Sequence, residues 1–269
     1  MALFTVIPLG IVLWFAFTNA DGQFTLSNLS SIVEYAGTFG LSIFLGAIAT
    51  VICLVLAFPL AYTISRAKGR VQQTMVMIIM LPMWMNFLLR TYAWMSILDN
   101  NGLLNRLFQS IGLIDLYNSI FGTSLEFLPL LNTQGAVVLG MVYNYLPFMI
   151  LPIYSVIVKL DNSLLEAARD LGANSVGVFR KVIFPLSLPG ILSGVTMVFV
   201  PSVSTFAISR LLGGGTQMML GDLIEQQFLG GAYNPHLGAA ISMVMMVVVV
   251  VCMVVMNHFG DGEEQAVMM

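Results

Sequence analysis

Long runs of uncharged, apolar residues most constrain the fold of this chain. A transmembrane helix needs about 20 predominantly apolar residues, and the sequence contains six runs close to or above this length. Hydrophobic residues make up 58% of the chain and charged residues 9%, whereas soluble domains carry roughly 25% charged residues. We therefore predict an all-α, polytopic membrane protein with a single transmembrane domain over residues 1–269. The six predicted transmembrane helices are residues 2–19, 39–64, 73–98, 135–158, 186–208 and 237–257.

The first apolar run admits a second interpretation, a secretory signal peptide. It begins almost at Met1 and has no basic lead. A signal peptide carries a positively charged first region and a small-residue cleavage site, and this run shows neither convincingly. We therefore interpret it as a membrane span. A start upstream of this sequence is a further alternative.

The distribution of Lys and Arg over the loops predicts how the spans are oriented. Basic residues concentrate in cytoplasmic loops, and two loops on one side carry seven of them against two in the three opposite loops. We therefore expect the loop of about residues 160–184, and both termini, on the cytoplasmic side. The seven are Arg66, Lys68, Arg70, Lys159, Arg169, Arg180 and Lys181, and the two are Arg106 and Arg210.

The loops predicted to lie outside are acidic, and two of them are long. Leu103, Leu107 and Ile111 recur at helical spacing, so we expect a short amphipathic helix there, and a second helix over about residues 218–228. The acidic side chains would attract a cationic solute or a basic surface of a binding protein, and the sequence leaves both interpretations open. They are Asp21, Glu34, Asp99, Asp115, Glu126, Asp222 and Glu225.

The predicted cytoplasmic loop contains the longest charged, amphipathic passage of the chain. Ser163 and Glu166 have the spacing of a capping box, which predicts a helix from the residue after Ser163. Gly172 lies where a helix C-terminus favours a left-handed residue, and Asn174 or Ser175 can cap a second short helix. The loop should therefore form a helix, a turn and a helix. A purely structural interpretation, in which Glu166 only caps its helix, leaves the later residues unexplained.

The order E-A-A-R-D-L-G at residues 166–172, followed by V-I-F-P at 182–185, resembles the EAA loop of the permease subunits of ABC importers. The resemblance implies the type I, MetI-like permease fold in a bacterial inner membrane. It implies as partners an ATPase subunit dimer that binds ATP and Mg, a second homologous permease subunit, and a periplasmic or extracellular solute-binding protein. This chain itself would not be an enzyme and would hold no cofactor. The implied ATPase-coupling residues are Glu166, Ala167, Ala168, Asp170, Gly172, Phe179 and Pro185.

Two further regions resemble spermidine/putrescine permeases of the PotB type. They are L-P-M-W-M-N-F-L-L-R-T-Y-A-W at residues 81–94 with N-G-L-L-N at 101–105, and F-A-I-S-R-L-L-G-G at 206–214 with G-D-L-I-E at 221–225. The resemblance implies import of polyamines. Relatives that carry other solutes share parts of the R-T-Y-A-W passage, so an organic cation, thiamine or a metal chelate stays an alternative.

Candidate substrate-pathway residues begin in the third predicted span. Asn86, Arg90 and Trp94 are four residues apart and form one stripe on a helix. A buried Arg in a span faces a cavity or a partner, and because Arg is no natural ligand for a polyamine, we expect Arg90 to brace a nearby acid. Carboxylates and aromatic faces bind ammonium groups, although an interfacial aromatic belt is the alternative for the tyrosines and Trp94. The predicted substrate-pathway residues are Trp84, Asn86, Arg90, Tyr92, Trp94, Asp99, Tyr143, Asp222 and Glu225.

The sequence does not indicate other classes of chemistry. It contains no G-x-x-x-x-G-K-[ST] motif, so we expect no ATP binding by a P-loop. His236 and His258 are isolated, and Cys53 and Cys252 lie in apolar runs, so we predict no catalytic residue and no metal site. A stand-alone secondary transporter is the alternative from another class. It predicts inverted repeats and a coupling-ion site within the spans, and would leave the EAA-like loop without a purpose.

Overall fold

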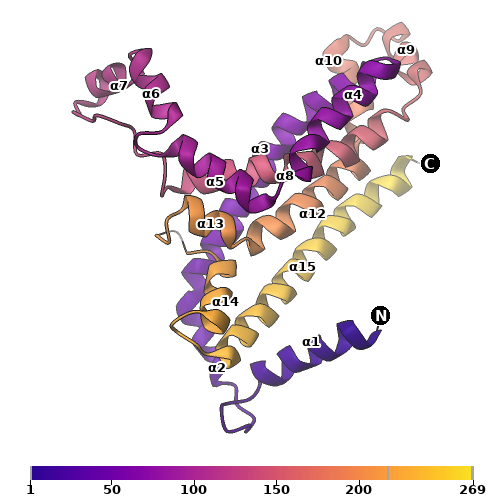
Figure 1. Ribbon diagram of the computed structural model, residues 1–269. Helices are drawn as coiled ribbons and strands as arrows, with labels where there is room; N and C mark the ends of the chain where they lie inside the picture. Colours follow the sequence, from indigo (N-terminus) through magenta and orange to yellow (C-terminus); the bar gives the residue numbers. More distant parts are fainter. Residues whose placement is uncertain (1, 217, 268–269) are drawn as a thin grey trace. The chain divides into compact units, whose positions relative to one another are not determined.

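The computed structural model describes residues 2–216 and 218–267. Over these residues the chain is built from helices, and the one extended pairing is an isolated bridge between Thr18 and Phe24 (Figure 1). The all-α prediction is therefore confirmed. The chain divides into two compact units. The first unit comprises Met1–Gly46, Asn86–Met141 and Val203–Val249, and the second comprises Ala47–Met85, Val142–Ser202 and Val250–Met269.

Four long helices pass from one unit into the other, and the shorter helices belong to one unit each. The long helices are α3 (Ala36–Arg66), α8 (Gln134–Ile157), α12 (Leu188–Ser204) and α15 (Pro235–Val267). The first unit also holds α1 (Ala2–Ala16), α2 (Ser27–Ser31), η1 (Ile32–Tyr35), α5 (Phe87–Leu98), α6 (Leu103–Ser110), α7 (Leu113–Phe121), α13 (Ala207–Leu212) and α14 (Leu220–Leu229). The second unit also holds α4 (Gly69–Met80), η2 (Leu81–Trp84), α9 (Asn162–Asp170), α10 (Ser175–Val178), the π-helical turn η3 (Phe179–Ile183) and α11 (Phe184–Leu186).

Three helical segments within the described residues are long and apolar enough to cross a membrane. They are Ser27–Arg66, Gln134–Ile157 and Pro235–Val255. Counting two interrupted helix pairs as one span each raises the number to five, compared with the six predicted spans. The predicted span at 2–19 corresponds to α1, which has 15 residues and is therefore shorter than the roughly 20 residues that a span needs.

The predicted span at 73–98 corresponds to two helices rather than one. α4 continues into η2, which ends at Trp84, and Met85 is extended. Asn86 then caps α5, because its Oδ1 accepts a hydrogen bond from the backbone N–H of Leu88 at 2.8 Å. A side chain that satisfies the first donors of a helix favours a helix start at that point. The apolar pattern on both sides of Asn86 conceals this break.

The core of the second unit lies where α3, α8 and α12 pack together. On α12, a Cβ atom added at Gly190 would lie 2.8 Å from the carbonyl oxygen of Pro152, and one at Gly194 would lie 2.7 Å from Met149 Sδ. On α3, Ala57 is fully buried. Because small residues let helix backbones approach closely inside membranes, these glycines account for the tight contact between α8 and α12.

The first unit contains both short helices that the sequence predicts outside the membrane. α6 covers Leu103–Ser110 and α14 covers Leu220–Leu229, so both helices are confirmed, and their position outside the membrane stays a prediction. Asn105 fixes α6, since its Nδ2 donates to Asp99 O at 3.2 Å and to Leu128 O at 3.0 Å while its Oδ1 accepts from Leu128 N at 2.9 Å. One buried side chain thus closes the segment between α5 and α8.

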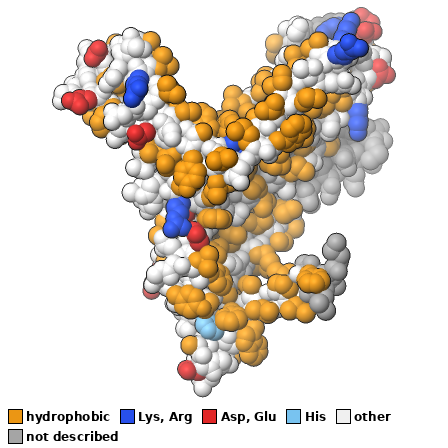
Figure 2. Space-filling model, viewed as in Figure 1, with side chains coloured by type: hydrophobic (Ala, Val, Ile, Leu, Met, Phe, Trp, Pro, Cys, Tyr) orange, Lys and Arg blue, Asp and Glu red, His pale blue; other side chains and the backbone are white. Residues whose placement is uncertain are grey.

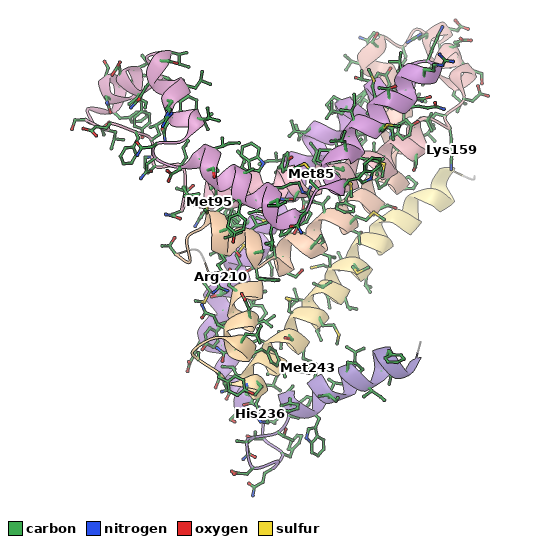
Figure 3. All side chains as sticks on the ribbon, in the orientation of Figure 1. Met85, Met95, Lys159, Arg210, His236 and Met243 are labelled. Atoms are coloured by element: carbon green, nitrogen blue, oxygen red, sulfur yellow. The ribbon has the colours of Figure 1, made fainter. Side chains whose placement is uncertain are left out.

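Polar contacts also join distant parts of the first unit. Ser42 Oγ on α3 accepts from the N–H of Leu220 at 2.8 Å, which holds the start of α14. His236 at the start of α15 lies beside the end of α1, with its Nδ1 3.1 Å from Phe15 O (Figure 3). These contacts position α14, which carries two of the predicted site residues.

Candidate functional site

The helix–turn–helix of the predicted cytoplasmic loop begins with α9. Asp161 caps this helix, since its Oδ1 accepts from Ser163 N at 2.9 Å. Hydrogen bonds from the backbone and side chain of Ser163 hold the pKa of Asp161 below its ordinary value. The prediction that Ser163 and Glu166 form a capping box, with the helix starting after Ser163, was wrong, because α9 already begins at Asn162. A carboxylate in extended backbone at Asp161 provides the acceptor two residues earlier.

The turn between α9 and α10 depends on a left-handed glycine, as predicted. Gly172 has φ +83°, and its N–H donates to Arg169 O at 2.8 Å while Ala173 N donates to Ala168 O at 3.0 Å. These bonds satisfy the last carbonyls of α9 as a left-handed C-terminus does. Asn174 then caps α10, because its Oδ1 accepts from Gly177 N at 2.8 Å. The two helices therefore have a defined relative geometry.

One face of this helix pair packs into the core of the second unit and the other is exposed. Leu165 and Val178 are buried in the core of the second unit, whereas Leu171 is 89% exposed and Val176 is 70% exposed. Charged side chains gather at this end of the second unit (Figure 2). Glu166, Ala167, Arg169 and Asp170 are exposed, and Ala168 is half-buried. An anchored helix that presents apolar tips among charges has the composition of a protein-docking surface.

Phe179 connects the loop to α3 rather than standing free. Its ring packs edge-on against Phe58 with the centroids 5.2 Å apart, and Phe58 also lies 6.0 Å from the ring of Phe184. These three rings line an apolar groove of about 440 Å³ together with further residues of α3. Pro185 lies in α11, directly after this cluster. Movement of the loop would therefore reach α3 through aromatic contacts.

The predicted substrate-pathway residues near α5 occupy different environments. Asn86 is the N-cap of α5, and Asp99 follows the C-terminus of this helix and is exposed. Tyr92 is 46% exposed and Trp94 is half-buried on α5. In the second unit, Trp84 is exposed on η2 and Tyr143 is half-buried on α8.

Arg90 is 8% exposed, and its Nε and Nη1 make no hydrogen bond to the residues that the structure describes. Among those residues we find no carboxylate paired with it. The expectation that Arg90 braces an acid is therefore not met within the described part of the chain. Thr91 beside it is fully buried, so this face of α5 lies inside the first unit.

The acids on α14 form the second candidate site. Arg210 on α13 (Figure 3) makes an ion pair with Glu225, in which the single nitrogen Nη1 lies 2.9 Å from both Oε1 and Oε2. Asp222, one turn earlier on α14, is 7% exposed, and burial raises the pKa of its carboxyl group. The three side chains line a pocket of about 70 Å³ with Gly215, Met218 and Gln226. The fold thus brings together two of the predicted acids.

The family assignment follows from comparison with known proteins. Residues 57–262 match the model of the family described as binding-protein-dependent transport system inner membrane component. This chain belongs to that family. Both candidate sites lie within the matched residues.

Relatives of this chain include curated permeases. The chain is 37% identical over 250 residues to the spermidine/putrescine transport system permease protein PotB of Haemophilus influenzae, with 90% of this chain and 84% of the relative covered. It is 34% identical to the protein of the same name from Escherichia coli K12, with 92% of this chain and 89% of the relative covered. The permease is therefore of the PotB type within the ABC importers.

The fold of the permease has solved counterparts. A chain of a bacterial ABC transporter involved in the import of the acidic polysaccharide alginate matches with a TM-score of 0.77 at 15% identity, covering 96% of this chain and 90% of that chain. A chain of the MetNI methionine ABC transporter in an inward-facing conformation matches with a TM-score of 0.57 at 19% identity, covering 88% of this chain and 98% of that chain. These matches support the MetI-like, type I fold.

Three residues of the permease's candidate sites escaped the sequence analysis. Phe58 is an ordinary aromatic residue of an apolar run, and only its contact with Phe179 identifies it. Arg210 was used for topology and as part of the passage at residues 206–214, but it was not placed among the site residues, although it lies 15 residues from Glu225. Asp161 precedes a better-known capping pattern. For Arg210, the signal in the sequence was its charge opposite to that of Glu225, on the next predicted helix.

Proposed function

We propose that this permease is the transmembrane subunit of an ATP-driven importer that moves spermidine or putrescine across the bacterial inner membrane. The observation that carries the proposal is the 37% identity over 90% of the chain to a spermidine/putrescine permease. The acidic pocket on α14 supports it, because a polyamine needs carboxylates to replace the hydration of its ammonium groups. The similar structures at 15–19% identity bear on the fold and not on the solute.

ATP hydrolysis belongs to a partner in this proposal. α9 and α10 dock on an ATPase subunit, which binds ATP and Mg, and this chain supplies no catalytic residue or cofactor. The exposed Leu171 and Val176 would be buried on docking, which stabilises the contact by roughly 25 cal/mol for each Å² of apolar surface removed from water. Glu166, Arg169 and Asp170 would set its orientation through charge complementarity.

In this mechanism the α9–α10 loop transmits movement of the ATPase to the packed helices of the second unit. Its anchors Leu165 and Val178 lie in the core of the second unit, so a displacement imposed by the ATPase moves packed helices rather than a loose segment. The ring contact between Phe179 and Phe58 extends that movement to α3. Alternating access then requires a second homologous permease subunit and a solute-binding protein outside. Both termini and the α9–α10 loop lie in the cytoplasm.

The proposal is tested on the assembled complex. The permease would be purified from its native membranes through an affinity tag and reconstituted in nanodiscs. We expect an ATPase subunit to co-purify, and ATP hydrolysis to rise when the binding protein is added with spermidine or putrescine. Thiamine, choline and a metal chelate serve as comparison solutes. Stimulation by one of these solutes and not by polyamines would change the assigned solute. The absence of any ATPase partner would overturn the proposal.

A further inference from the structure

The pocket on α14 already contains a cation, which is the side chain of Arg210. The guanidinium occupies both carboxylate oxygens of Glu225 at 2.9 Å, yet the Arg210 side chain is 64% exposed while that of Glu225 is 25% exposed. The acid is therefore held in place and the base is at the surface. An exposed ion pair of this kind contributes only about 0–1 kcal/mol, so Arg210 can leave at small cost.

Asp222 provides the unsatisfied charge in the same pocket. Its Oδ2 accepts from Met219 N at 3.1 Å, but its buried Oδ1 has no hydrogen-bond partner among the described residues. The neighbouring Ser209 hydroxyl donates to Phe206 O at 2.9 Å and also lies near enough to interact with the Asp222 carboxyl group. Because a buried carboxylate oxygen with few donors is costly, a cationic donor that enters the pocket would stabilise it.

The backbone around α14 makes Asp222 hard to move. A Cβ atom added at Gly221 would lie 2.5 Å from Ser204 O and 2.6 Å from Thr205 O, so only glycine allows α14 to approach the chain here. Ser42 Oγ holds the N–H of Leu220 at 2.8 Å. The two carboxylates are thus presented from a fixed helix, one turn apart, whereas the competing cation extends from the surface of α13.

We infer that Asp222 and Glu225 form a binding site for one primary ammonium group of the solute, and that Arg210 occupies this site as a tethered substitute until the solute displaces it. The inference rests on the proposed function. The pocket volume of about 70 Å³ exceeds the roughly 30 Å³ share of one water molecule, which suits an ammonium head and its first methylene. The rest of the polyamine extends beyond the pocket.

Competition between Arg210 and the solute makes a prediction that an ordinary structural ion pair does not. If Arg210 competes with the solute, removing it strengthens solute binding, whereas removing Glu225 weakens it. If the pair only holds α13 against α14, both changes harm transport in the same direction. Arg210→Gln and Glu225→Gln should therefore have opposite effects on the spermidine concentration that gives half-maximal uptake.

The experiment measures spermidine and putrescine uptake by the complete complex in proteoliposomes. We expect Arg210→Gln to lower the half-maximal concentration about three- to fivefold, since the displaced pair is weak. We expect Glu225→Gln and Asp222→Asn each to raise it about tenfold or more. Arg106→Gln and Glu126→Gln are matched controls, because they remove the same charges from exposed positions on the first unit.

The outcomes separate the inference from the proposed function. Wild-type complex that takes up neither polyamine would overturn both. Polyamine uptake by the wild type, with Arg210→Gln and Glu225→Gln shifting the half-maximal concentration in the same direction or not at all, would overturn the ammonium site alone. Assembly of each variant complex is verified by gel filtration, and a fall in the amount of complex at unchanged half-maximal concentration also identifies a structural pair and refutes the competition.

Discussion

Replacing Gly172 with valine tests the coupling loop most sharply. Gly172 has φ +83°, and nothing lies within 4 Å of a Cβ atom added there, so the new side chain finds space and the cost is conformational. Forcing an L-residue into the left-handed region costs about 1–2 kcal/mol, and a β-branched residue belongs at the upper end. One to two kcal/mol changes a population ratio by about 5- to 30-fold. The turn that sets α9 against α10 should therefore be populated at least about fivefold less relative to competing conformations.

The assay is ATP hydrolysis by the reconstituted complex with and without spermidine-loaded binding protein. We expect Gly172→Val to reduce the stimulated rate at least about fivefold while membrane insertion stays normal, and Gly172→Asn to retain more activity, because asparagine tolerates the left-handed region. Gly122→Val is the matched control, since Gly122 has φ +64° and an equally open Cβ position at the end of α7. Wild-type stimulation in Gly172→Val would refute the coupling role, and equal losses in both variants would reveal general destabilisation instead.

Three further predictions concern orientation, the first unit and pH. In a cysteine-free background, Ser175→Cys should react with a membrane-impermeant thiol reagent only from the cytoplasmic side and Ser119→Cys only from outside; the reverse pattern would invert the topology. Asn105→Ala should lower the free energy of unfolding of the complex by about 1–3 kcal/mol, because it removes three part-buried hydrogen bonds to Asp99 and Leu128, whereas Gln109→Ala, which removes one exposed hydrogen bond, should change the melting temperature little. Because burial raises the pKa of the Asp222 carboxyl group, this carboxyl accepts a proton at a higher pH than an ordinary aspartate, and polyamine affinity should weaken as pH falls into that range. Asp222→Asn should flatten this dependence, and an unchanged pH profile in the variant would exclude Asp222.

The sequence predicted the conformation of the α9–α10 loop well at positions where a single residue type determines the backbone conformation. Gly172 was assigned its role from residue type and position, and the cap of α10 was narrowed to Asn174 or Ser175, because few residues adopt a left-handed turn or cap a helix. The start of α9 was misplaced because Asp161 and Ser163 both offer a capping oxygen within one turn. Their competition is decided by backbone geometry, which a pattern of residue types does not contain.

Helix breaks inside apolar runs could not be predicted in the same way. Composition marks residues 73–98 as one run, but Asn86 starts a new helix within it. Hydropathy averages over about 19 residues, so a single capping side chain hardly changes the value. The same averaging hides the gap between α12 and α13, where Ser204 ends one helix and Ala207 begins the next.

The acids of the loops that we predict to lie outside show why counting charges does not identify a binding site. As a set, these side chains create a field that concentrates cations near the protein, and such a field weakens over a Debye length of about 8 Å at physiological salt. Glu225 adds little to that field, because Arg210 neutralises it at 2.9 Å. Asp99 and Glu126 are exposed and face water, so they contribute to attraction at a distance and not to selectivity. Asp222 is buried with one oxygen unsatisfied, so its interaction with an entering ammonium group is screened least. In the proposed mechanism, attraction of the solute and its retention thus depend on different acids, although the sequence alone gives all of them the same weight.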